Sequence, residues 1–278
     1  MTTHDRAIAD SVANMTTSFE GRHVLVAGGT SGINLGIAKG FARAGAAVSV
    51  FSRSADKVEA AAAELRELGG SVHGGTADVR DPEAVQAALS AAVSAHGAVH
   101  VLVSGAAGNF PAPAVGLSSN GFGSVVNIDL LGSFHVLRFG FEHLAKPGAS
   151  VINISAPQAF IPMAFQSHVC AAKAGVDMLT KTLAIEWGPA GVRVNSLVPG
   201  PIDDTEGMKR LMADPKKKAK LAGTVPLQRL GHVDDCADVA LFLASDAARY
   251  VTGAILPVDG GWSLGGAQVA MSMIMSND

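Results

Sequence analysis

Short runs of aliphatic and β-branched residues alternate along the chain with longer, alanine-rich amphipathic segments. The short runs are almost continuously apolar, which is typical of strands that are buried on both faces. We predict strands at 23–28, 47–52, 71–75, 99–105, 150–155, 192–198 and 254–258. We predict helices near 33–44, near 55–68, after Asp81-Pro82, near 119–145 and near 166–187.

Strand–helix alternation of this kind predicts right-handed crossovers and a parallel sheet. The expected fold class is therefore α/β: a single doubly wound Rossmann domain, with an about seven-stranded parallel sheet and helices on both faces. The sequence contains no internal repeat and no break in composition. We expect the domain to cover 21–266, preceded by a flexible polar arm at 1–20 and followed by a tail at 267–278.

The composition narrows the class of protein further. The 278 residues are 48% hydrophobic and 16% charged, with a formal net charge of -3, so nothing suggests a nucleic-acid partner. No apolar run has the length of a membrane span. The two cysteines do not form a disulfide framework, and the nine histidines lack the spacing of metal ligands. We therefore expect no metal. Because the chain does not end in a peroxisomal address, we expect a cytoplasmic protein.

A glycine-rich segment, VAGGTSGINLGIA, follows the first predicted strand and opens the first predicted helix. Gly28 allows the tight turn, and Gly32 lets backbone amides approach a pyrophosphate at the positive end of the helix. With Thr30 and Ser31 these residues form the candidate cofactor loop; the alternative is an ordinary glycine-rich turn. Asn34 replaces the third glycine of the spacing. Because asparagine tolerates positive φ, we expect the turn to survive, with the Asn34 side chain near the cofactor.

The second predicted strand ends in FSRSADK, without the carboxylate that usually binds the ribose hydroxyls of NAD. Ser52 and Arg53 stand there instead. A guanidinium pairs with a 2′-phosphate in a bidentate way, so Arg53 favours NADPH. The alternative is a solvated arginine at the start of a helix.

Four later segments, ADVRD, VSGAAG, RVNSLVPGPI and YVTGAILPVDGG, complete a pattern that resembles the short-chain dehydrogenase/reductase superfamily. The resemblance covers Gly21 to Gly266 in order and spacing. It implies a single Rossmann domain, a nicotinamide cofactor and usually a homotetramer. It also implies that cofactor contacts come from Asp78 and Val79, and that Pro199, Gly200 and Ile202 border the nicotinamide.

The usual catalytic set of that superfamily is Asn, Ser, Tyr and Lys. Here the corresponding positions hold Asp129, Ala156, Val169 and Lys173. Only the lysine remains, so the sequence argues against an ordinary ketone reductase.

A narrower resemblance accounts for these departures. The segments AAGNFPAP, NIDLLGSFHV, QSHVCAAKAGVDMLTKTLAIEWGP and PGPIDDTEGMKRL resemble 2,4-dienoyl-CoA reductases, especially the peroxisomal type, in which an aspartate replaces the asparagine and the tyrosine is absent. The resemblance implies that Asn109 and Phe110 contact the acyl thioester. Gln158 matches the position of the tyrosine in the mitochondrial relatives. The implied contacts to the coenzyme A ester are Arg80, Arg210 and Ser118.

The chemistry of a conjugated thioester explains how the tyrosine can be absent. A ketone reductase must protonate a basic carbonyl oxygen as hydride arrives. In a dienoyl thioester, hydride adds to the far end of the conjugated system and leaves an extended enolate, whose oxygen needs fixed hydrogen-bond donors. Asn109 can donate to that oxygen, and Asp129 can hold the water that later protonates carbon. Lys173 can bind the nicotinamide ribose and add positive potential.

Each candidate also has a structural interpretation. Lys173 fits a surface lysine of a helix, Asp129 a residue that satisfies buried backbone, and Asn109 a loop-stabilising side chain. For His168, a hydrogen-bonded wall histidine is favoured over a proton donor. Met208, Met212 and their neighbours indicate a helical flap over an apolar pocket, or else ordinary core.

Three functions remain open at this point. The first is NADPH-dependent reduction of a 2,4-dienoyl-CoA or a related enoyl thioester in unsaturated fatty-acid breakdown. The second is another oxidoreductase of the superfamily, in which Asp129 or His168 replaces the tyrosine on an alcohol or ketone. The third is a catalytically silent nucleotide-binding protein, suggested by Asn34, Ala156 and Val169.

Overall fold

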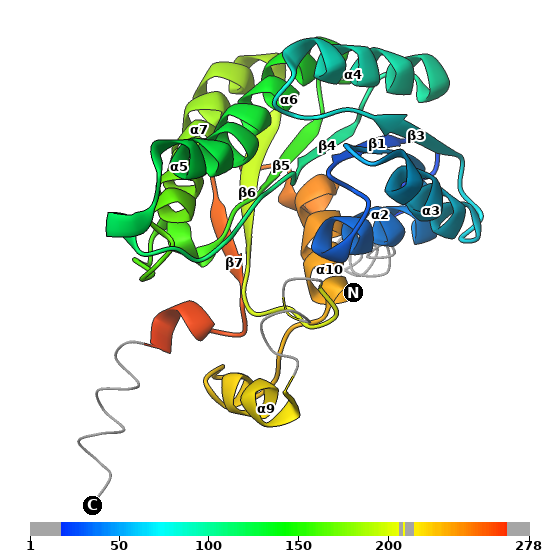
Figure 1. Cartoon of the computed structure of the whole chain (residues 1–278). Helices are drawn as coiled ribbons and strands as arrows, with labels where there is room; N and C mark the ends of the chain where they lie inside the picture. The colour runs from blue at the N-terminus through cyan, green and yellow to red at the C-terminus, as the bar shows by residue number, and fades with distance from the viewer. Residues whose placement is uncertain (1–17, 206–207, 209–213, 266–278) are drawn as a thin grey trace, which may run out of the picture.

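The computed structural model describes residues 18–205, 208 and 214–265. These residues form one parallel sheet of seven strands in the order β3-β2-β1-β4-β5-β6-β7 (Figure 1). The strands are β1 (His23–Ala27), β2 (Ala47–Ser52), β3 (Val72–Thr76), β4 (Val101–Ser104), β5 (Ser150–Ile154), β6 (Arg193–Pro199) and β7 (Ile255–Val258). The fold-class prediction is confirmed, and each strand lies within about one or two residues of its predicted range.

The helices cover both faces of the sheet (Figure 1). The α-helices are α2 (Gly32–Arg43), α3 (Ala55–Arg66), α4 (Pro82–His96), α5 (Ser119–Val126), α6 (Gly132–Gly140), α7 (Ser167–Trp187), α9 (Pro215–Gly223) and α10 (Val233–Ala244). Among the described residues there are also a π-helical segment, η2 (Asn127–Leu131), and short 3-10 turns such as η1 (Ala114–Gly116), η3 (Phe141–His143) and η4 (Pro157–Ala159). The predicted helix near 119–145 is therefore a succession of α5, η2, α6 and η3, and neither α9 nor α10 was predicted.

The core has two layers because successive strand residues point to opposite faces of the sheet. On β1, Leu25 packs in the layer under α4, α6 and α7, whereas Val24 and Val26 pack in the layer under α2 and α10. All three side chains are fully buried. This explains the continuously apolar strand runs in the sequence.

Residues before the predicted domain boundary at residue 21 also contact the domain. Phe19 is 1% exposed, and its ring packs edge-on against Phe41 of α2 at 4.9 Å between centroids. Phe19 is therefore packed against the domain, although the predicted arm at 1–20 includes it. Residues 1–17 and the predicted tail at 267–278 lie outside the described residues.

Candidate active site

The sheet order changes direction between β1 and β4, and the candidate site lies at the carboxyl ends of these strands. This is the position where open α/β sheets bind their ligands. The loop after β1 makes a tight turn at Gly28, which has φ +75°. A β-carbon added at Gly28 would lie 2.9 Å from the Cα of Ala106 in the loop after β4, so only glycine fits.

The predicted cofactor loop ends at the start of α2. Gly32 has φ +53°, and Ser31 is the N-cap residue but makes no side-chain cap hydrogen bond. The first amides of α2 are therefore left for an anion. Thr30 Oγ1 donates to Ser52 Oγ at 3.1 Å, which fixes the loop against the end of β2. The glycine turn, the free helix start and the switch point together fit a dinucleotide cofactor.

The expectation that Asn34 takes the place of a glycine in the turn is wrong. Asn34 lies within α2, outside the positive-φ region, so it does not act as a glycine substitute in a turn. Its Nδ2 donates to the carbonyl oxygens of Gly105 at 2.7 Å and of Gly28 at 3.3 Å. Asn34 thus links the loops that follow β1 and β4, the two strands on either side of the switch point.

Asp78 and Arg80 form a bidentate ion pair, although the resemblance assigned them to different ligands. Arg80 Nη2 lies 2.6 Å from Asp78 Oδ2, and Arg80 Nε donates to both carboxylate oxygens. The Arg80 hydrogen bond is the largest cause that lowers the pKa of Asp78, and the charge of Arg53 adds to it. Arg53 is exposed, whereas Val79 is 4% exposed and packs in the core. Three of the predicted polar contacts therefore gather at the ends of β2 and β3.

Asp129 and Lys173 form a buried pair on the other side of the switch point. Their side chains are 1% and 7% exposed, and Lys173 Nζ lies 3.4 Å from Asp129 Oδ2. Lys173 Nζ also donates to the carbonyl of Ile154 at 3.0 Å, and the Gly108 amide donates to Asp129 Oδ1 at 2.7 Å. The surface-lysine interpretation of Lys173 is therefore wrong.

The π-helical segment Asn127–Leu131 positions this carboxylate. A π turn accommodates one more residue than an α-helical turn and often marks a functional site. On the facing helix, Val169 is 3% exposed and packs with Val125 and Ala172. The place of the usual tyrosine is thus filled by an apolar contact between α5 and α7.

The predicted substrate residues that the structure describes lie on several separate segments. Asn109 is exposed, and Phe110 is 38% exposed. Ser118 is the N-cap of α5, where its Oγ accepts from the Gly121 amide at 3.1 Å. Gln158 Nε2 donates to Gln166 Oε1 at 2.7 Å. Arg210 and Met212 lie outside the described residues.

The segment after β6 supplies backbone rather than side chains. Pro199 ends the strand, and the Gly200 amide donates to the Val258 carbonyl at 3.0 Å. Ile202 is 3% exposed, so its side chain belongs to the core. Backbone atoms such as the Gly108 amide and the Ile154 carbonyl carry no residue-type signal, which is why the sequence did not reveal them.

His168 also departs from expectation. It is fully buried, as a wall histidine would be, but neither ring nitrogen has a hydrogen-bond partner. Its ring packs against Phe110 at 4.7 Å between centroids.

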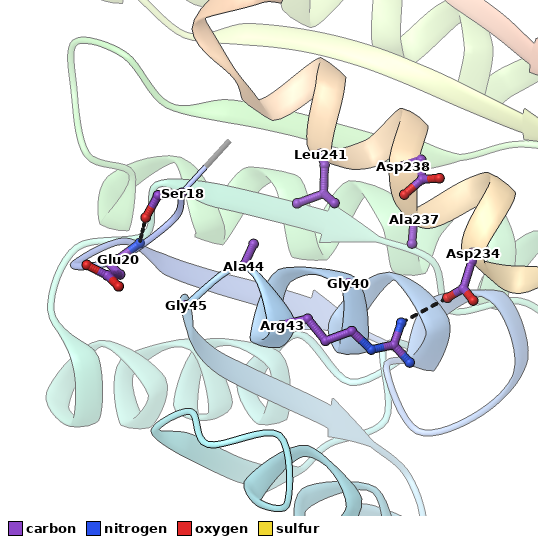
Figure 2. A pocket seen from close by; sticks show the side chains of 10 residues that line it. All are labelled: Ser18, Glu20, Gly40, Arg43, Ala44, Gly45, Asp234, Ala237, Asp238 and Leu241. Atoms are coloured by element: carbon purple, nitrogen blue, oxygen red, sulfur yellow. Dashed lines mark hydrogen bonds and ion pairs between the residues drawn. The ribbon is translucent and has the colours of Figure 1, made fainter. Parts of the chain in front are cut away.

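A surface pocket elsewhere in the fold contains none of the predicted site residues (Figure 2). It lies between the end of α2 and α10, where Arg43 pairs with Asp234 at 3.0 Å. Its lining residues are Ser18, Glu20, Gly40, Arg43, Ala44, Gly45, Asp234, Ala237, Asp238 and Leu241. Among the described residues we find no cluster of histidine, cysteine and acidic side chains suited to a metal ion, and no helix that is long and apolar enough to cross a membrane.

Comparison with known proteins identifies the family. A family model described as Enoyl-(Acyl carrier protein) reductase matches residues 27–263. The peroxisomal 2,4-dienoyl-CoA reductase [(3E)-enoyl-CoA-producing] of Danio rerio is 42% identical over 85% of this chain and 79% of its own length. The probable 2,4-dienoyl-CoA reductase [(2E)-enoyl-CoA-producing] of Bacillus subtilis is 38% identical over 87% of this chain and 96% of its own.

Solved structures of short-chain dehydrogenases are similar to this chain over most of its length. A short chain dehydrogenase from Bacillus anthracis is 35% identical, with a TM-score of 0.81 over 88% of this chain and 97% of its own. A gluconate 5-dehydrogenase from Burkholderia cenocepacia, solved with NADP and tartrate, is 30% identical, with a TM-score of 0.82 over 90% of this chain and 98% of its own. The chain therefore belongs to the short-chain dehydrogenase/reductase superfamily and is similar within it to the 2,4-dienoyl-CoA reductases.

Proposed function

We propose that this chain reduces 2,4-dienoyl-CoA thioesters with NADPH, in the breakdown of unsaturated fatty acids. The observation that carries the proposal is the buried Asp129–Lys173 pair: one turn before Lys173 on the same helix, an apolar contact stands where the tyrosine would be. Such a site holds a carboxylate and a cation but no phenolic acid for a ketone oxygen. The names of several curated relatives, which are about 40% identical, point to the same substrate class.

Bound NADPH would supply hydride to the far end of the conjugated system. The enolate oxygen of the thioester then needs donors, and the exposed Asn109 follows Gly108, whose amide is fixed on Asp129. Asp129 has a second carboxylate oxygen near Lys173, and this pair can orient a water toward the carbon that takes the proton. Lys173 would bind the ribose of the cofactor and keep the positive potential of the site.

The preference for NADPH rests on the charges at the end of β2. Arg53 is exposed there, and the nearby carboxylate of Asp78 is already paired with Arg80. Positive charge without a free carboxylate favours a 2′-phosphate over a ribose hydroxyl. Arg80 remains 47% exposed in its pair, so its outer face can also meet a phosphate of coenzyme A, as proposed with Arg210 and Ser118.

We also propose that the chain assembles as a homotetramer through α6 and α7. An apolar groove follows these helices, and Leu131, Phe134 and Met178 are exposed beside it. A helix face of this composition is typical of a contact between identical subunits. Light scattering should give the mass of four chains, and Phe134→Glu should reduce it, whereas Tyr250→Glu should not.

Cytoplasmic localisation remains a prediction, because several relatives are named as peroxisomal.

The central experiment follows NADPH oxidation with trans-2,trans-4-dienoyl-CoA and, in parallel, with simple ketones. The dienoyl thioester should react and the ketones should not; the reverse result would favour the ordinary oxidoreductase, and no reaction with either would favour a silent protein. Asp129→Asn keeps an acceptor for the Gly108 amide but removes the charge, so it should lower kcat by about 10²–10⁴ while NADPH affinity is retained. Lys173→Ala should weaken both NADPH binding and turnover.

A further inference from the structure

The buried imidazole of His168 is the most unusual polar group in the described part of the chain. Its side chain is fully buried in the first turn of α7, and both Nδ1 and Nε2 lack hydrogen-bond partners. A neutral imidazole offers one donor and one acceptor, and native proteins rarely leave both buried and unpaired. A histidine that served only to fill space would be replaced without loss by an apolar residue, so this one needs another explanation.

The location of the imidazole suggests what pairs with it. The ring of Phe110 packs against it at 4.7 Å between centroids with an interplanar angle of 56°, and Phe110 is 38% exposed. Phe110 is two residues after Gly108, whose amide is bonded to Asp129. On α7, His168 precedes Lys173 by five residues, which is about 7.5 Å along the helix axis. The imidazole thus lies beneath the loop that borders the Asp129–Lys173 pair.

A second unpartnered polar atom lies on the neighbouring element. Gln158 Oε1 in η4 is buried without a partner, and η4 packs against α7. Gln158 is itself held by Gln166, at the start of that helix. Two neighbouring elements, η4 and α7, therefore each hold a buried polar group without a partner, which is expected where a polar ligand completes the hydrogen bonds.

The loop that covers His168 is held at a second point beyond Phe110. The Ala112 amide donates to the Phe165 carbonyl at 2.8 Å, and Phe165 has φ +65°. Phe165 is 60% exposed, so the conformation is not imposed by burial of its ring. An aromatic residue with positive φ is rare and is maintained only where its surroundings require it. The loop is thus fixed at Gly108 and Ala112, with Asn109, Phe110 and Pro111 between these two points.

We propose that His168 donates a hydrogen bond to the thioester oxygen of the bound acyl-CoA once the substrate has displaced the Phe110 ring. This inference rests on the proposed function, because it requires a conjugated thioester in the site. No proton is transferred: the N–H of the imidazole stabilises the negative charge that collects on the oxygen when hydride arrives at carbon. His168 is then the second donor, beside Asn109, and the acyl-CoA supplies the partner that the free chain lacks.

The test compares His168→Leu, which keeps the volume without a donor, with His168→Gln and His168→Asn, which keep an N–H. The Leu variant should lose about 10²-fold in kcat on the dienoyl thioester, because the bond is made in the transition state. Its KM and its NADPH affinity should change little, and its Tm should not fall, since an unpaired polar group has been removed. Gln or Asn should recover a large part of kcat. His143→Leu, outside the site, serves as the histidine control.

A Leu variant with kcat within about twofold of the wild-type value would overturn the proposal. So would a Leu variant that loses Tm and NADPH binding together with activity, without rescue by Gln or Asn, because that pattern marks a structural residue. A second measurement is independent of turnover: saturated hexanoyl-CoA should shift the imidazole ¹⁵N resonance of His168 in the wild-type protein. A shift without turnover of dienoyl-CoA would sink only the proposed function, whereas turnover without a shift would sink only the role of His168.

Discussion

Acidification should destabilise this protein through His23, the first residue of β1. The side chain is 1% exposed, and its two ring nitrogens lie 2.8 Å from the Gly97 carbonyl oxygen and from Ser49 Oγ. Because the carbonyl only accepts, Nδ1 carries the proton and Nε2 accepts from Ser49 in the neutral form. Burial lowers the pKa of His23 from 6.5 to about 4, and the neighbouring His96, His100 and His73 add to the effect against the Gly97 hydrogen bond.

The sign and size of the effect follow from proton binding. Below pH 6.5 the unfolded chain takes up a proton at His23, whereas the folded chain does not until the pH approaches 4. The unfolded state therefore gains stability as the pH falls through this window. The difference in pKa corresponds to about 3 kcal/mol in total, of which about 2 kcal/mol is lost between pH 7 and pH 5.

Urea unfolding at a series of pH values, at one fixed protein concentration, measures this loss. His23→Asn retains a donor for Gly97 but cannot titrate. We expect the variant to be less stable at pH 7 by about 1–3 kcal/mol, since Ser49 loses its acceptor. Its further decline between pH 7 and pH 5 should be smaller than the wild-type decline by about 2 kcal/mol. The pKa values of His96 and His100 are also lowered by burial. The free energy of unfolding should therefore still decrease as the pH falls in both proteins. Equal declines in the two proteins would refute the reasoning.

Three further predictions concern the cofactor and the missing tyrosine. Arg53→Ala should reduce the preference for NADPH over NADH by about 1–3 kcal/mol in calorimetric titrations; an unchanged preference would remove Arg53 from the cofactor site. Gly28→Ala and Gly69→Ala both place a side chain at positive φ, but only Gly28 meets the backbone of Ala106, so Gly28→Ala alone should abolish NADPH binding. Equal losses of binding would argue against that contact. Val169→Tyr should lower stability by about 1–3 kcal/mol through overpacking and give no gain in dienoyl-CoA turnover, which thermal melts and stopped-flow NADPH oxidation would check.

Much of the fold could be predicted because burial of the strands on both faces leaves a direct trace in composition. The helix α10 was missed although its start carries a capping box at His232 and Asp235. No strand follows within a few residues there, so strand–helix alternation gave no cue. The π-helical segment could not be predicted, because one extra residue barely changes the apolar period of a long helix.

The site was predictable in its residue types but not in its pairings. Lys173 and Asp129 were chosen separately, and only the structure brings them together as a buried pair. The ion pair of Asp78 with Arg80 depends on side-chain directions that spacing does not encode. Asn34 was misjudged because a missing glycine suggests a turn, whereas here the residue lies inside α2 and its amide group reaches the neighbouring strand's loop.

The π-helical segment Asn127–Leu131 separates the placement of Asp129 from the packing of the two helices beside it, α5 and α6. A π turn is one residue inserted into an α-helix, so α5 before it and α6 after it each keep their own packing register. Loss of a single codon in this segment would leave both helices seated, yet it would remove the bulge that turns Asp129 toward Gly108 and Lys173. One genetic event could therefore change the placement of the carboxylate without rebuilding the core around it.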